Sequence, residues 1–63
     1  MKIVTLKPLN NRAKQRCNTH GDRMALIEVG KWDGEEAIFC ESLKNTFGGE
    51  KWAGWFVLGT DVK

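Results

Sequence analysis

The residues of this 63-residue chain with the most reactive side chains are two cysteines, one histidine and a neighbouring aspartate. Cys17 and His20 are separated by two residues, which on a helix brings both side chains to one side, and Asp22 follows them. Structural zinc sites are usually completed by four protein ligands in paired Cys/His knuckles, and here the remaining candidate, Cys40, is distant. A Cys17–Cys40 disulfide is the other alternative, which a reducing compartment disfavours. We therefore favour two buried thiols, with no metal site and no cofactor.

The same residues are a weak candidate for covalent catalysis. A triad of Cys17, His20 and Asp22 would need side chains that converge from separate elements, together with an oxyanion hole and a pocket. The glycine pair at 48–49 lacks the spacing of a phosphate-binding loop. We predict a protein that binds rather than an enzyme.

Charge is divided unevenly along the chain. Residues 1–23 contain six basic residues and one acidic residue, whereas residues 24–63 contain four basic and seven acidic residues. A basic segment of this kind is typical of phosphate contacts, and an indole ring can stack on an unpaired base. The sequence therefore predicts nucleic-acid binding through five residues: Arg12, Lys14, Arg16, Arg23 and Trp52.

A protein partner is the alternative. One face of the predicted hairpin carries three carboxylates and no basic side chain, mixed with apolar and aromatic groups. Such a face suits a contact with another protein, and its predicted anchors are Leu26, Trp32 and Phe39.

The chain is organised around a β-hairpin over residues 23–42. Asp33-Gly34 between two apolar-rich runs predicts a type I′ turn, because both central residues of that turn need positive φ. This turn places Trp32 opposite Glu35 and thereby fixes the cross-strand pairs farther along the hairpin. The resulting core-facing pairs are Val29 with Ile38, Ile27 with Cys40, and Ala25 with Ser42.

A short helix is expected before the hairpin. Lys2–Leu6 is rich in β-branched residues and reads as a strand that ends before Pro8. Asn10-Asn11 then offers an N-cap for a helix over Arg12–His20, closed by Gly21, with Ala13, Cys17 and His20 on its buried side. A long basic loop is the alternative for this segment.

The C-terminal part is expected to form one more strand. Residues 44–54 are rich in turn formers, and Trp55–Gly59 reads as a strand with apolar residues on both faces, which favours a buried position rather than an edge. We expect the tail, Thr60–Lys63, to be frayed.

These elements predict one α+β domain over residues 1–63, in the order β-α-β-β-β, with an antiparallel meander packed on one short helix. A small SH3-like barrel, in which residues 8–22 form a long loop, is the alternative. A domain this short is marginally stable, so a homo-oligomer is a reasonable expectation. The longest apolar run is far shorter than a bilayer span, and no secretory signal is visible, so we expect no membrane contact and a cytoplasmic location.

Several short motifs resemble small uncharacterised proteins of tailed bacteriophages. They lie between Pro8 and Trp55 and comprise Pro8-Leu9-Asn10, Arg12, His20-Gly21-Asp22 and Lys51-Trp52. The resemblance implies a small accessory protein that acts in the cytoplasm of an infected bacterium. Such proteins commonly bind host factors or nucleic acid.

Overall fold

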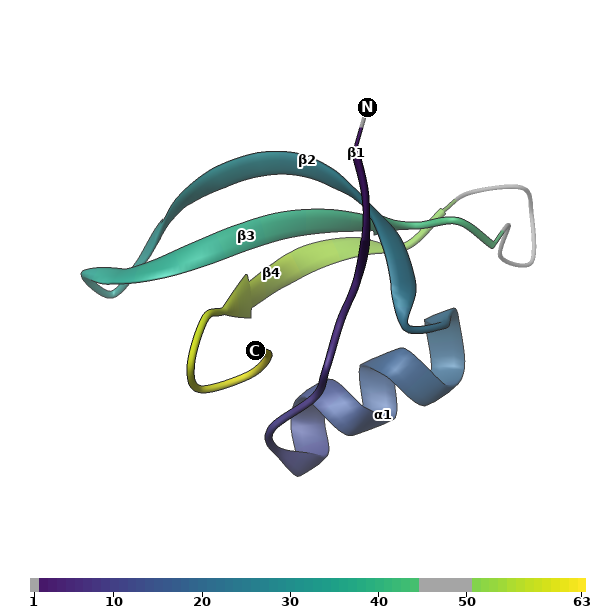
Figure 1. Ribbon diagram of the computed structural model, residues 1–63, viewed down its shortest axis with the longest axis horizontal. Coiled ribbons are helices and arrows are strands. Elements are labelled where there is room, and N and C mark those ends of the chain that lie inside the picture. The colour runs from purple at the N-terminus through teal and green to yellow at the C-terminus, as the bar shows by residue number, and fades with distance from the viewer. Residues whose placement is uncertain (1, 45–50) are drawn as a thin grey trace.

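The computed structural model describes residues 2–44 and 51–63, and contains one helix beside a four-stranded antiparallel sheet (Figure 1). Of the turn-rich segment predicted over residues 44–54, residues 45–50 lie outside the described residues, and residues 53–54 belong to the last strand. The elements, in chain order, are β1 (Lys2–Thr5), α1 (Asn11–His20), β2 (Arg23–Trp32), β3 (Glu35–Ser42) and β4 (Ala53–Val57). The strands lie in the order β1-β2-β3-β4. The predicted α+β class is confirmed.

Helix α1 begins and ends where the sequence indicates. The side chain of Asn10 accepts a hydrogen bond from the N–H of Ala13 at 2.8 Å, which satisfies one of the free donors of the first turn. Gly21 ends the helix with φ of 90° and donates its N–H to the carbonyl of Cys17. Residues 8–22 are therefore not the long loop of the barrel alternative. The helix is also too short and too polar to cross a membrane.

The hairpin turn is confirmed. Asp33 and Gly34 have φ of 51° and 82°, as a type I′ turn requires, and Trp32 pairs with Glu35. The predicted pair of Val29 with Ile38 is also present, but it is not part of the core as expected: Val29 is 66% exposed, because this end of the hairpin extends beyond the core.

Further from the turn the predicted register is wrong, because β2 contains a β-bulge between Leu26 and Glu28. Ile27 is the extra residue, so Cys40 pairs with Leu26, and Ser42 pairs with Met24 in place of Ala25. A bulge inserts one unpaired residue. Every residue of β2 farther from the turn than the bulge therefore has its side chain on the face opposite to the predicted one. Ile27, which was expected in the core, is consequently 49% exposed, whereas Met24, expected on the other face, is fully buried.

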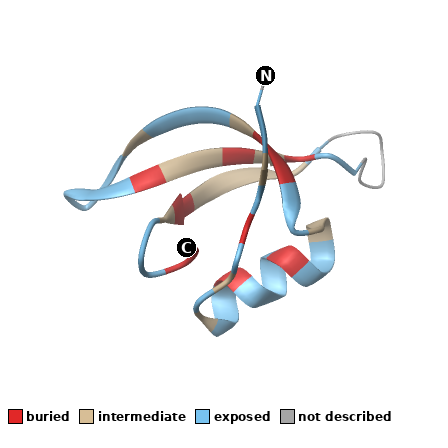
Figure 2. Cartoon of the chain, viewed as in Figure 1, coloured by how far each residue is buried: buried red, intermediate tan, exposed pale blue. Residues whose placement is uncertain are grey.

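The core lies between the sheet, the helix and the C-terminal tail. Figure 2 shows buried positions on the parts of the sheet near these two elements and an exposed far end of the β2–β3 hairpin. The helix contributes Ala13 and Cys17 to this core, as predicted, whereas His20 is only half-buried. The other buried members of the cluster are Leu6, Met24, Cys40, Phe56 and Val62.

Three expectations for the C-terminal part are wrong. Strand β4 covers residues 53–57, not 55–59, and lies at an edge of the sheet. Thr60–Lys63 is not frayed, because Val62 is fully buried and the N–H of Lys63 donates to the carbonyl of Lys7. Gly59, with φ of 85°, lets the chain reverse after β4, and burial of the valine then stabilises the tail against the segment after β1.

Candidate functional site

The outer face of the sheet, which is the face turned away from α1, carries a cluster of three aromatic side chains. The ring of Trp55 lies 5.2 Å from that of Phe39 and 6.4 Å from that of Trp32, centroid to centroid. The indole of Trp55 also lies against the backbone of Gly30, where a Cβ atom would come within 3.1 Å of its Cη2 atom. The small residue on β2 thus makes room for the ring, and the cluster spans β2, β3 and β4.

Three carboxylates share this outer face with the aromatic cluster. Glu28 and Trp55 both pair with Phe39 across the strands, and Glu35 pairs with Trp32. Glu41 lies on the same face of β3, two residues beyond Phe39. Among residues 2–44 and 51–63 the only ion pair joins other groups, so these three carboxylates have no ionic partner within the described part of the chain.

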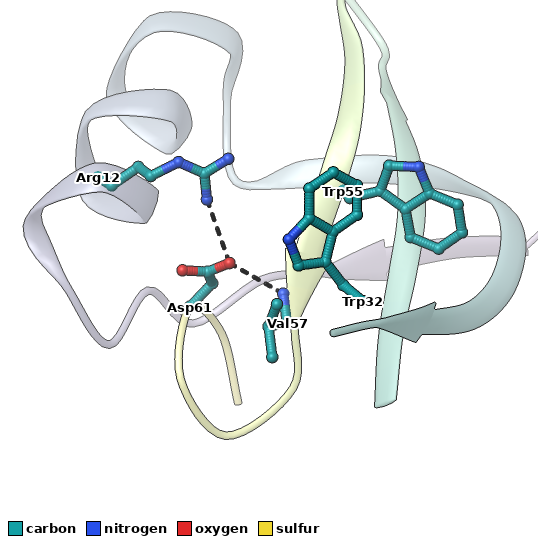
Figure 3. Close-up of a pocket in the computed structure, with 5 residues that line it drawn as sticks. All are labelled: Arg12, Trp32, Trp55, Val57 and Asp61. Atoms are coloured by element: carbon teal, nitrogen blue, oxygen red, sulfur yellow. Dashed lines mark hydrogen bonds and ion pairs between the residues drawn. The ribbon is translucent and has the colours of Figure 1, made fainter. Parts of the chain in front are cut away.

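A pocket of about 350 Å³ opens beside β4 and continues the aromatic cluster. It is lined by Arg12, Trp32, Trp55, Val57 and Asp61. Figure 3 shows the guanidinium of Arg12 on one side of this pocket and the two indoles on the other. Its volume is in the range of small-ligand and side-chain binding sites.

Asp61 holds the polar side of the pocket together. It is only 6% exposed and accepts hydrogen bonds from Asn10 Nδ2 at 2.8 Å, from Val57 N–H at 2.9 Å and from Arg12 Nη1 at 3.1 Å. Burial by itself would raise the pKa of Asp61, but the hydrogen bonds from Val57 and Asn10 and the charge of Arg12 together hold this pKa below its ordinary value. The carboxylate is therefore ionised near neutral pH, and it fixes the position of Arg12.

The basic residues predicted to bind nucleic acid do not form one patch. Arg12 and Arg16 lie one helical turn apart on one flank of α1, whereas Lys14 lies on the opposite flank. Arg23 starts β2, where it pairs with Thr5. Since Arg12 is bonded to Asp61, part of its charge is already compensated.

Trp52, the predicted stacking platform, is packed against its own chain. The ring of His20 stacks on its indole at 4.6 Å with an angle of 6° between the planes. A Cβ atom at Gly54 would lie 2.5 Å from the indole, so the ring also covers that glycine. Arg16 adds a cation–π contact at 5.4 Å from the ring centroid. These contacts tie β4 to α1.

The residues predicted for a protein contact are divided between the two faces. Trp32 and Phe39 belong to the aromatic cluster, while the bulge turns Leu26 toward the core, where it packs against the buried cluster. Sequence reasoning did not identify Trp55 as the centre of this cluster, although its alternation in β4 indicates a side chain on the face opposite Phe56. It also missed Asp61, because a short polar tail carries no sign of docking.

The two cysteines are buried, unbridged thiols in the structure. Burial raises the pKa of Cys17, with a further increase from the charge of Asp22, and burial also raises the pKa of Cys40. Within the described ranges no three histidine, cysteine, aspartate or glutamate side chains come close enough to hold a metal ion.

Comparisons with protein-family models, with curated proteins and with solved structures give no match to this chain. Its function has to be inferred from its own residues and their geometry.

Proposed function

We propose that this chain is a non-enzymatic binding domain that binds a protein partner through the outer face of its sheet, and that the partner presents a basic, extended segment. One observation carries this proposal. Trp32, Phe39 and Trp55 form a continuous aromatic cluster, and the three carboxylates beside it lack an ionic partner among the described residues. Aromatic faces and carboxylates together attract ammonium and guanidinium groups.

The energetics of such a contact rest mainly on one side chain. Trp32 is 53% exposed, so a partner that covers it would bury a large apolar area. Tryptophan is enriched among the few residues that dominate binding energy in protein interfaces, especially when a polar rim surrounds it. Glu28 and Glu35 supply that rim here. The carboxylates would favour a basic partner and disfavour an acidic one.

Nucleic-acid binding through the basic N-terminal segment is the competing hypothesis. Phosphates would be repelled by the carboxylates of the outer face, and the basic residues of α1 do not act together because Arg12 and Lys14 lie on opposite flanks of the helix. The ring of Trp52 is stacked on His20, which limits its use for a base. We therefore rank a protein partner first, and the same experiment tests both.

A binding role also agrees with the state of the thiols. A nucleophilic cysteine needs a lowered pKa and an accessible sulfur, whereas both thiols of this chain are buried and have raised pKa values. The resemblance to small tailed-phage proteins fits a domain that acts on a host factor by contact.

The test is fluorescence anisotropy with three labelled probes: a peptide of alternating lysine and leucine, its glutamate counterpart, and a single-stranded oligonucleotide. We expect the basic peptide to bind, and Trp32→Leu to weaken it by about tenfold or more. Val29→Thr is the matched control, because Val29 is 66% exposed but lies on the other face of β2.

Either of two results would contradict the proposal. One is equal binding of the lysine and glutamate peptides. The other is salt-sensitive binding of the oligonucleotide that is lost in Arg12→Gln/Arg16→Gln and unchanged in Trp32→Leu.

A further inference from the structure

The pocket beside β4 contains a cation whose hydrogen-bonding capacity is mostly unused. Arg12 donates to Asp61 through Nη1 only, and its side chain is 61% exposed. Its Nε and Nη2 groups make no hydrogen bond to the described residues. Guanidinium groups prefer planar anions such as carboxylates, which they can bind through two parallel hydrogen bonds.

Asp61 is poorly placed to be the recognition group of this pocket, because it is only 6% exposed. Both of its oxygens are already bonded, Oδ1 to Asn10 and Oδ2 to Arg12 and Val57. Its role is to position the guanidinium. The polar group that remains available to an incoming molecule is therefore the outward side of Arg12, in a pocket whose other walls are two indoles and a valine.

The free edge of β4 leads into this pocket. Leu58 N–H donates to the carbonyl of Glu36 on β3. Because backbone groups point to alternate sides along a strand, those of Val57 and Trp55 point away from β3. The tail bonds both backbone groups of Val57, through Asp61 Oδ2 and Asp61 N–H. An extended segment that pairs with β4 beside Trp55 is therefore stopped at Val57, next to Arg12 (Figure 3).

We infer that the pocket receives the C-terminal carboxylate of the partner segment, with Arg12 as its ligand and the indoles of Trp32 and Trp55 around the last side chain. This inference rests on the proposed function and specifies it further: the basic segment is the free C-terminus of the partner. A segment paired with β4 directs every second side chain to the outer face, from which its basic groups can reach toward the carboxylates, and its terminal carboxylate binds the exposed guanidinium of Arg12. Opposite charges are thus matched at two separate places along one segment.

The test compares the alternating lysine–leucine peptide with a free C-terminal acid and the same peptide with a C-terminal amide. We expect the acid to bind about tenfold more tightly at low salt, which corresponds to about 1.4 kcal/mol. Arg12→Gln should abolish this preference. Lys14→Gln removes the same charge from the opposite flank of α1 and should leave the preference unchanged.

Each outcome separates this inference from the proposed function. If acid and amide bind equally to the unmodified protein, the C-terminal inference is overturned and the outer-face proposal stands. If neither binds, the proposed function fails. Should Arg12→Gln fold poorly, the NMR signal of Arg12 Nε–H in the unmodified protein gives the answer: it shifts with the acid but not with the amide if the inference holds, and shifts equally with both if it does not.

Discussion

Replacing Asp61 by asparagine tests the principal polar contact of the fold. The substitution keeps the shape of the side chain but removes its charge, and it turns an NH₂ group toward a site where the carboxylate accepts hydrogen bonds from Asn10, Val57 and Arg12. A hydrogen bond to a charged group contributes about 1.5–3 kcal/mol. Asparagine retains one acceptor, and the ion pair with Arg12, whose own side chain is exposed, adds less than about 1 kcal/mol. We expect Asp61→Asn to lower the free energy of unfolding by about 2 kcal/mol.

The pH dependence of this loss has a defined sign. The folded-state pKa of Asp61 lies below its ordinary value. The folded state therefore stabilises the ionised form of this carboxyl group more than the unfolded state does. The stabilisation is present above the unfolded pKa and is lost as the pH falls through the lower, folded pKa. The difference between the unmodified protein and Asp61→Asn should therefore be largest near neutral pH and shrink in acid.

Urea denaturation followed by tryptophan fluorescence measures both effects. A domain of this size is expected to have a total stability of about 3–9 kcal/mol, so the variant remains measurable. Asp33→Asn is the matched control, because Asp33 is exposed in the turn and asparagine also tolerates its positive φ. A change below about 0.5 kcal/mol for Asp61→Asn, or a loss that does not vary with pH, would refute this account of the tail.

Three further predictions concern the core and the sheet. Gly54→Ala should destabilise the domain by about 1–3 kcal/mol, because its Cβ would lie 2.5 Å from Trp52, and an unchanged melting temperature would contradict that packing. Ile27→Thr should change the stability by less than about 0.5 kcal/mol, whereas Leu26→Thr should cost about 1–2 kcal/mol. If chemical denaturation showed equal losses of stability for Ile27→Thr and Leu26→Thr, the bulge would not lie at Ile27. The two buried thiols should react with a disulfide reagent more slowly in the native protein than in urea, and equal rates would contradict their burial.

Local signals in the sequence were sufficient for the helix and the turn. The cap at Asn10 and the glycine at 21 define α1, and Asp33-Gly34 defines the hairpin, because each depends on the conformational preference of a few adjacent residues. The bulge at Ile27 could not be predicted in this way. An isoleucine in a strand of alternating residues carries no local mark of being unpaired.

The same difference explains what was missed at the site. The shared face of Trp32 and Phe39 follows from alternation in one hairpin, which the sequence shows directly. The pocket depends on Arg12 and Asp61, which are 49 positions apart in the chain and meet only after the tail docks against the segment that follows β1. Long-range contacts of this kind have no counterpart in residue spacing.

The most direct test of the outer-face proposal is an NMR titration of the labelled protein with the basic peptide, followed through the indole N–H signals of its three tryptophans. Trp32 and Trp55 belong to the proposed contact, whereas Trp52 is packed between β4 and α1. The proposal predicts that the first two signals shift in proportion to occupancy while that of Trp52 stays in place. Shifts confined to Trp52 and to the backbone of Arg12 and Arg16, or produced by an oligonucleotide and not by the peptide, would contradict it.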